Sequence, residues 1–404
     1  MTPLVRVLCL ANMAKTTANG VLMAMVVLYF TRTVHIGPDE VGLALSVGAA
    51  VGLVAAVPAG RLADKYGPRG TASVLLCGLG LATWGYPLVG DFVGLVIVSG
   101  LVLAIESGAN ASVYALVAGL VPAKERVRAS SYIRAASNVS IAAGAAAGAI
   151  GLYLDTPTGY LALLVGAGSL FIVSGLLFRR VPRVPPTPHR AGEPGWPVLR
   201  DLPYVAVSLL NSVLVMNAGV LSVALPVWIA ESTAAPAWVY ALVVIVNAAA
   251  VVVLQVRVSK GGEDVPGGVQ AWRWAGILLA GGCGLYAIAV GQPVWAATAL
   301  LLAGAMAHVL GEMLHAAGAW ALGYGLAPER AQGQYQGLFT TSSLLGQMVT
   351  PVLATVVLGH LGAAGWAVFA GLFLTAGALA PRVAGWAQKP AARKPAALTT
   401  LGRH

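Results

Sequence analysis

The chain has 404 residues and a mass of 41.0 kDa, and it is strongly apolar, with 58% hydrophobic and only 9% charged residues. A soluble globular protein carries roughly 25% charged residues, and disordered chains are poor in apolar residues and rich in charge. The composition therefore excludes both classes, and the formal charge of +10 lies in short segments between apolar runs, which gives no reason to expect a nucleic-acid partner.

Twelve apolar runs follow one another along the chain. A helix that spans a bilayer needs about 20 mostly apolar residues, whereas barrel strands are about 10 residues long and alternate apolar with polar positions. The runs are longer and apolar all round, so we predict an all-α integral membrane protein with twelve transmembrane helices. They are residues 5–30, 41–60, 71–90, 93–118, 132–154, 160–178, 202–230, 237–256, 273–291, 293–322, 335–359 and 365–385.

The basic residues predict the orientation of these spans. With the N-terminus inside, 22 of the 24 lysines and arginines fall in inner segments, and Arg134 is counted among them. Arg32 alone falls in an outer segment, and Lys15 lies within the first span. Because cytoplasmic segments are enriched in Lys and Arg, we expect both termini in the cytoplasm of a bacterial plasma membrane.

A proline- and arginine-rich stretch divides the chain into two sets of six spans. Residues 179–201 combine prolines with charged residues, which is typical of a linker. We therefore predict an N-terminal six-helix bundle at 1–178, a cytoplasmic linker at 179–201, a C-terminal six-helix bundle at 202–385 and a cytoplasmic tail at 386–404.

The two halves share an internal repeat. Residues 106–122 read ESGANASVYALVAGLVP and residues 312–328 read EMLHAAGAWALGYGLAP, with seven of seventeen positions identical at an ungapped offset of 206. The matches include Glu106 with Glu312 and Pro122 with Pro328, which chance similarity of two Ala- and Leu-rich helices does not explain. Duplicated halves with a site between them are typical of secondary transporters.

The loop after the second span carries a motif, Gly60-Arg-Leu-Ala-Asp64-Lys-Tyr-Gly67-Pro-Arg69-Gly. It resembles the signature loop of the major facilitator superfamily, and the overall pattern is similar to bacterial drug and metabolite exporters of the 12-span type. The resemblance implies two pseudo-symmetric six-helix bundles around a cavity lined by spans 1, 4, 7 and 10. It also implies a latch at the inner gate formed by Gly60, Asp64, Gly67 and Arg69. From the residues alone, Asp64 can accept hydrogen bonds from a helix N-terminus or pair with Arg69.

Two further segments bear on the direction of transport. The fifth span contains GAAAGAIG, with Gly144, Gly148 and Gly151. It resembles in weakened form the glycine-rich motif of the family's antiporters, but small residues four apart also allow close helix packing. The intramembrane arginine of the family's fourth-span motif is missing, because Ala104 stands near its place.

Three predicted cavity-lining spans each carry one polar stripe that contains an ionisable residue. Such residues inside a membrane are costly, by about 2.5–3.5 kcal/mol on insertion scales, and mark functional sites. By helical spacing the stripes are Asn12, Lys15 and Asn19 on span one, Glu106, Asn110 and Tyr114 on span four, and His308, Glu312 and His315 on span ten. Asn138, Asn211, Asn217, Asn247 and Gln347 are further candidates either for substrate contact or for helix association.

We expect Lys15 and Glu106 to interact across spans one and four, either as a static ion pair or as part of the coupling machinery. Glu312 has no cation in span seven, so desolvation should favour its protonated form and make it the main proton carrier. A metal site at His308, Glu312 and His315 lacks a fourth ligand and is not expected.

The sequence therefore predicts a secondary active transporter that exports small organic molecules in exchange for protons. No GxxxxGK[ST] loop is present, so we expect a proton gradient rather than a nucleotide or other cofactor to supply energy. The alternatives are a proton-coupled importer of a sugar or metabolite and, more remotely, a lipid-modifying membrane enzyme. Beyond substrate and membrane lipid we expect no obligate partner, and a monomer.

Overall fold

The computed structural model describes residues 2–187 and 196–389, and the regular structure within them is helical, without a strand. The long helices of the first half are α1 (Pro3–Arg32), α2 (Pro38–Tyr66), α3 (Pro68–Thr83), α4 (Phe92–Leu120), α5 (Arg126–Leu154) and α6 (Pro157–Phe178). Those of the second half are α8 (Leu202–Gly219) continued by the π-helical turn η3 (Val220–Ala224) and α9 (Leu225–Ser232), then α10 (Trp238–Val258), α11 (Val265–Ile288), α12 (Val294–Gly325), α13 (Gln332–Leu361) and α14 (Gly365–Ala387).

The described residues therefore contain twelve long helices when α8, η3 and α9 are counted as one. This confirms the predicted fold class. Ten segments are long and apolar enough to cross a membrane, and the last of them, Glu329–Ala387, holds both α13 and α14. α11 is not among the ten, because glycines, Gln270 and Arg273 lower its hydropathy. The seventh span, predicted as continuous, is interrupted at η3, where Pro226 lacks the N–H that a regular helix needs.

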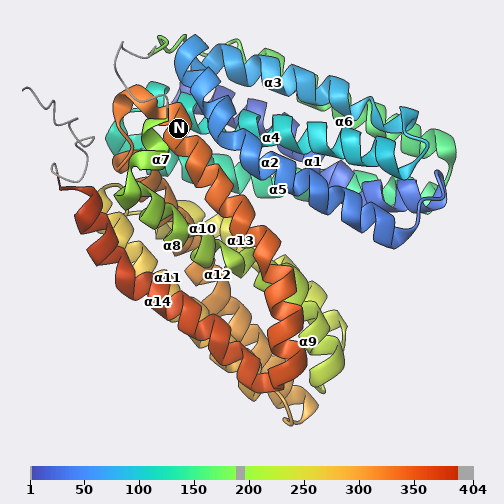
Figure 1. Ribbon diagram of the computed structural model, residues 1–404. Coiled ribbons are helices and arrows are strands. Elements are labelled where there is room, and N and C mark those ends of the chain that lie inside the picture. Colours follow the sequence, from blue (N-terminus) through green and yellow to red (C-terminus); the bar gives the residue numbers. More distant parts are fainter. Residues whose placement is uncertain (1, 188–195, 390–404) are drawn as a thin grey trace, which may run out of the picture.

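Two large hydrophobic cores, each drawn almost entirely from one half, hold the helices together. One core gathers residues such as Phe30, Leu76 and Phe171, and the other gathers residues such as Trp272 and Phe373. Figure 1 shows the two bundles as separate bodies that meet at one end and diverge toward the other. Large apolar side chains cover the outside, as with Met23, which is 77% exposed. Such a surface belongs in lipid, where helices satisfy their own backbone groups.

The internal repeat is visible in the structure. The turn η2 (Ala123–Glu125) follows α4, and the turn η4 (Glu329–Ala331) follows α12, at the same offset of 206 that relates the sequences. α5 and α13 begin at the next residue in each case. Helices α4 and α5 are thus the counterparts of α12 and α13, as two pseudo-symmetric bundles require.

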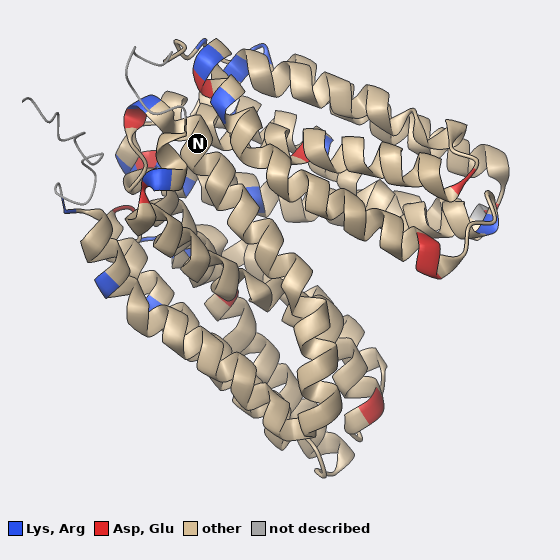
Figure 2. Ribbon diagram, viewed as in Figure 1, with Lys and Arg blue, Asp and Glu red and all other residues tan. Residues whose placement is uncertain are grey.

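Charged residues gather at the ends of the helices, most densely where the two bundles meet (Figure 2). This end carries the short helix α7 (Pro197–Arg200) and the first residues of α1 (Figure 1). We call it the basic end. Parts of the predicted linker and tail, residues 188–195 and 390–404, lie outside the described residues.

Candidate functional site

A cavity of about 490 Å³ lies between the two bundles. Its walls come from α1, α4 and α5 of the first half and from α8, α12 and α13 of the second. The four spans implied by the family resemblance are thus present, and α5 and α13 are additional. The repeat places aromatic rings at matching positions, since Tyr114 and Trp320 are 206 residues apart and both line the cavity.

Most of the predicted polar residues reach this cavity. Those that line it are Asn12, Lys15, Asn19, Glu106, Asn110, Tyr114, Asn138, Asn211, His315 and Gln347. Glu312 and His308 are not among the lining residues. The side chain of Glu312 is 15% exposed, whereas His308 is fully buried within its own bundle.

The charges on α1 and α4 contact amides rather than each other. The Lys15 Nζ donates to Asn110 Oδ1 at 2.5 Å, and Asn19 Nδ2 donates to Glu106 Oε1 at 2.7 Å. No ion pair within 4.0 Å joins Lys15 to Glu106, and both belong to the described residues. The predicted interaction is therefore electrostatic rather than a direct contact in this conformation, because each charged group hydrogen-bonds a neutral side chain of the opposite helix.

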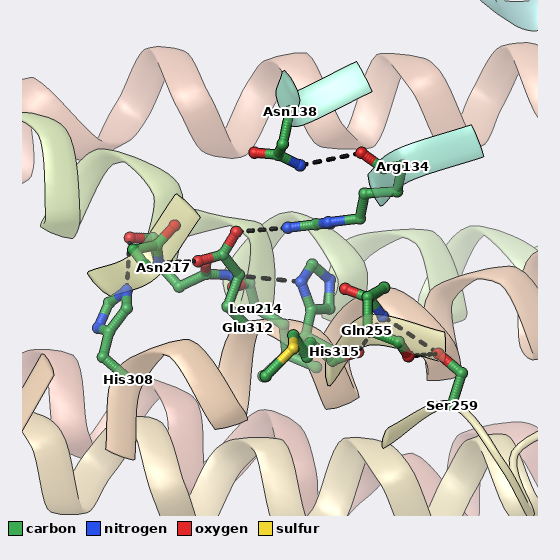
Figure 3. A network of polar contacts seen from close by, with 11 residues as sticks. Arg134, Asn138, Leu214, Asn217, Gln255, Ser259, His308, Glu312 and His315 are labelled. Atoms are coloured by element: carbon green, nitrogen blue, oxygen red, sulfur yellow. Dashed lines mark hydrogen bonds and ion pairs between the residues drawn. The ribbon is translucent and has the colours of Figure 1, made fainter. Parts of the chain in front are cut away.

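Glu312 has a cationic partner, contrary to prediction. Its Oε1 forms an ion pair with Arg134 Nη2 on α5, and its Oε2 accepts a hydrogen bond from Asn247 Nδ2 on α10 at 2.8 Å. Figure 3 shows the guanidinium of Arg134 pointing at the Glu312 carboxylate from the facing bundle. The pair therefore joins the two halves beside the cavity.

Arg134 was missed because it was counted with the inner loop. α5 begins at Arg126, so Arg134 lies eight residues, or about 12 Å, along the helix. Its Nε is buried without a hydrogen-bond partner, and only 27% of the side chain is exposed. A signal was available, since Ser137 and Asn138 follow at helical spacing and line the cavity with it.

The second-half wall is held by a hydrogen-bonded chain through His315. Its Nδ1 contacts Asn217 Nδ2 at 3.2 Å, and its Nε2 contacts Asn211 Oδ1 at 3.0 Å. Asn211 in turn donates to Ser342 Oγ and Ser343 Oγ of α13, each at 3.0 Å. An amide N–H on Nδ1 and an amide oxygen on Nε2 suit a neutral ring with its proton on Nε2. The chain therefore fixes Asn211 in the cavity wall.

His308 contacts the backbone of α8 through one ring nitrogen. Its Nε2 contacts the backbone oxygen of Asn217 at 3.1 Å, as Figure 3 shows. His308 and His315 thus both contact Asn217, through its backbone oxygen and its side chain respectively, whereas Glu312 contacts Arg134 and Asn247, although all three residues share one face of α12. The described residues contain no group of three potential metal ligands.

The signature loop binds the second half at the basic end. Asp64 Oδ1 accepts a hydrogen bond from the backbone N–H of Gly333 at 2.6 Å, and Oδ2 accepts one from Gln334 at 3.0 Å. These are the first turns of α13, where N–H groups lack helical partners and attract negative charge. A Cβ at Gly60 would lie 2.0 Å from the Gly333 oxygen, so glycine is needed for the two backbones to touch.

The rest of the motif supports this contact. Arg69 Nη1 donates to the backbone oxygens of Arg179 and Val181 at 3.2 and 3.1 Å. Gly67 has a φ of 91°, which lets α2 turn directly into α3. Beyond it, Thr187 of the linker donates its N–H to the backbone oxygen of Asp64 and its hydroxyl to the backbone oxygen of Arg330, both at 2.8 Å. The linker therefore lies against the junction of the halves.

The cavity is closed at the basic end. Besides the Asp64 contacts, Thr341 Oγ1 of α13 donates to the Leu53 oxygen of α2 at 2.9 Å, and Ser131 donates to Ser259 at 2.8 Å. Figure 1 shows the bundles diverging away from this end. The structure is thus the conformation of a two-bundle protein in which the helices of the two halves are joined at the basic end.

The glycines of the fifth span pack against the first. A Cβ at Gly144 would lie 2.1 Å from the Thr17 oxygen, and one at Gly148 would lie 2.7 Å from the Ala24 Cβ. Close helix packing therefore accounts for both positions.

The comparisons with known proteins agree with this architecture. The profile of the Major Facilitator Superfamily matches residues 8–351. No curated protein matches the chain by sequence. Solved structures share the fold at low sequence identity, and three of them illustrate it. The human organic anion transporter MFSD10 (TETRAN) is 17% identical, with a TM-score of 0.70 over 94% of this chain and 100% of that one. A bacterial homologue of the iron transporter ferroportin, in an outward-facing state, is 14% identical, with a TM-score of 0.73 over 96% and 100%. The proton:xylose symporter XylE is 14% identical, with a TM-score of 0.61 over 95% and 94%.

Proposed function

Because the chain belongs to the Major Facilitator Superfamily and is thus a secondary transporter that crosses the membrane many times, we propose that it exports a small organic molecule in exchange for protons. The membrane is the plasma membrane of a bacterium, with the basic end and both termini in the cytoplasm. The chain acts as a monomer without a bound cofactor. The ion pair between Arg134 and Glu312 carries this proposal, because it places a carboxylate that can take up a proton at the junction of the halves.

The cavity supports an organic substrate. It offers a cation at Lys15, an acid at Glu106, several amides and the rings of Tyr114 and Trp320. Amides and opposite charges hydrogen-bond polar groups, while the rings pack on apolar parts of a ligand. Cationic, zwitterionic and neutral amphipathic molecules all fit this mixture.

Protonation of Glu312 weakens the junction in the proposed cycle. The charged pair becomes a neutral acid beside an unpaired guanidinium, and breaking such a partly buried pair costs about 3 kcal/mol. Switching a two-state equilibrium from 1:99 to 99:1 takes about 5.5 kcal/mol. Proton binding thus supplies about half of the bias toward opening at the basic end. Substrate that binds there afterwards favours release of the proton and return to the state closed at the basic end, and this opposition couples the two fluxes.

The test uses the purified chain in vesicles that contain a trapped pH dye. A panel of organic cations, zwitterions, anions and sugars is added under an imposed proton gradient, and proton flux and uptake of each compound are recorded. We expect at least one compound to drive proton movement in wild type. Glu312→Gln should abolish gradient-driven accumulation but retain exchange of labelled for unlabelled compound.

The relative direction of the proton and substrate fluxes separates the two alternatives. Export with proton uptake predicts that protons and substrate move in opposite directions in right-side-out and inverted vesicles alike. Movement of both in the same direction would identify a proton-coupled importer instead. Undiminished gradient-driven accumulation by Glu312→Gln would contradict the role of Glu312 in either case.

A further inference from the structure

A second hollow lies on the outside of the second bundle, away from the central cavity. It has a volume of about 630 Å³ and lies between α11 and α14. α11 contributes Arg273 and Ile277, one helical turn apart, and α14 contributes a stripe that includes Leu374, Ala378 and Arg382. We call it the α11–α14 groove.

Small residues create this groove. The two helices approach closely, because a Cβ on Gly377 would lie 3.3 Å from the Arg273 oxygen and 3.0 Å from that of Trp272. Gly377 and Ala378 thus leave a channel between larger neighbours on either side. Ile277 and Leu374 are 49% and 46% exposed, so the channel has an apolar wall that faces the lipid.

The groove is polar at one end only. Arg273 lies eight residues after the start of α11, and Arg382 lies five residues before the end of α14, at depths of about 12 and 8 Å from the basic end. Ile277 and Leu374 come deeper in the membrane on the same stripes. Trp274 and Trp386, 50% and 42% exposed, flank the arginines, as aromatic residues do at a membrane interface.

Both arginines are available to a ligand. Neither has a carboxylate within 4.0 Å among the described residues. The contact of Arg273 is a hydrogen bond from Nη1 to Gln270 Oε1 at 3.3 Å, which leaves its other N–H groups free. Two unpaired guanidinium groups at the interface attract phosphate, which they can bind with parallel hydrogen bonds.

From this arrangement we propose that the α11–α14 groove binds one anionic phospholipid of the leaflet at the basic end. The phosphate lies between Arg273 and Arg382, and an acyl chain follows the channel past Ala378 toward Leu374 and Ile277. The order of charge at the interface and apolar surface toward the midplane matches the order of head group and acyl chain in a phospholipid. The site is independent of the substrate cavity and of the proposed direction of transport.

The experiment measures lipid binding to the purified full-length chain by native mass spectrometry. Phosphatidylglycerol is titrated against phosphatidylcholine with the same acyl chains, and inorganic phosphate is tested in a parallel thermal-unfolding series. We expect one phosphatidylglycerol to bind more tightly than the rest. The R273Q/R382Q variant should bind it about 30-fold more weakly, since each cation contributes to attraction of an anionic lipid.

Two further variants separate this site from general charge effects. R257Q/K260Q removes the same charge from two exposed side chains at the end of α10 and should bind phosphatidylglycerol like wild type. Ala378→Phe keeps both arginines but fills the channel, and it should also lose the tight lipid. Equal affinity of R273Q/R382Q and wild type, equal binding of phosphatidylcholine, or full stabilisation by inorganic phosphate alone would overturn the proposal.

Discussion

Arg134 and Glu312 are the two charges whose partnership most affects this protein. They lie on opposite bundles, and Asn247 holds the second carboxylate oxygen at 2.8 Å. A lone buried charge costs more than a neutralised pair. The consequences for stability follow directly from this geometry.

We predict that Arg134→Gln and Glu312→Gln each lower thermal stability, while the double variant recovers part of the loss. The expected coupling energy is about 2–3 kcal/mol, because each single variant leaves its partner unpaired. The measurement is a double-mutant cycle on the purified chain. Arg32 and Asp155 are the matched control, an ion pair at 3.3 Å whose side chains are each 52% exposed. Their coupling should stay below about 1 kcal/mol, and equal couplings for the two pairs would refute the special role of the first.

Lys15 provides a second prediction at this scale. Since its Nζ donates to Asn110 Oδ1, Asn110→Leu should leave the ammonium without an acceptor. Lys15→Met should therefore cost clearly less in the Asn110→Leu background than in wild type, by about 1.5–3 kcal/mol, the contribution of a hydrogen bond to a charged group. Lys15 and Glu106 should show weaker coupling in the same thermal assay. Stronger coupling of Lys15 to Glu106 than to Asn110 would contradict this prediction and show that Lys15 and Glu106 form a direct ion pair.

The sequence identified the residues of this region better than their contacts. Helical spacing correctly groups Lys15, Glu106 and His315 with the polar faces that line the cavity. It can do so because the 3.6-residue period of a helix depends on local geometry alone. The partner of Glu312 could not be derived, since it comes from the other half and depends on which end is closed. Counting of cations places Arg134 in a loop, because it ignores how far a helix extends beyond its apolar run.

At the scale of elements, the N-terminus of α13 is the part that the signature loop recognises. The alternatives for Asp64 left open by the sequence are distinguished here, since its carboxylate accepts two N–H groups of α13 while Arg69 contacts backbone oxygens of 179 and 181. The sequence alone suggests that Asp64 binds the N-terminus of a helix, but it does not indicate which of the twelve helices that is. The predicted spans were right in number, and the break at η3 was missed because one proline in an apolar run does not reveal a π-helical turn.

We predict that Asp64→Asn leaves the chain inserted and folded but slows turnover by about 5- to 30-fold. The lost charge at a helix N-terminus is worth about 1–2 kcal/mol, and the closed basic end is destabilised by that amount. The measurement is the transport rate at matched membrane levels. Asp264→Asn is the control, because Asp264 caps α11 at 2.8 Å within a single bundle. Wild-type turnover in Asp64→Asn would show that the contact is not a latch.

At the scale of the whole molecule, transport requires that the two bundles meet alternately at each end. The backbones of Gly60 and Gly333 meet at the basic end with no room for a side chain, and Gly337 similarly meets Ala56, whose oxygen would lie 2.6 Å from a Cβ on Gly337. Closure at this end thus depends on three glycines, whereas polar contacts such as that of Asp64 set its stability. Removing a polar contact shifts the equilibrium between the states closed and open at the basic end. Adding a methyl group at one of these glycines should forbid the closed state.

We therefore predict that Gly60→Ala holds the protein open at the basic end. A Cβ 2.0 Å from a backbone oxygen cannot be accommodated without separating α2 from α13. The measurement uses a chain in which Cys9, Cys77 and Cys283 are replaced by alanine and Ala319, in the cavity wall, is changed to cysteine. A membrane-impermeant maleimide should label this cysteine faster from the basic side in Gly60→Ala than in the parent, and net transport should be lost.

Gly78→Ala, with nothing within 4 Å of the added Cβ, should behave like the parent. Unchanged labelling from the basic side in Gly60→Ala would mean that the bundles do not need this contact to close, and that alternation depends on another part of the interface.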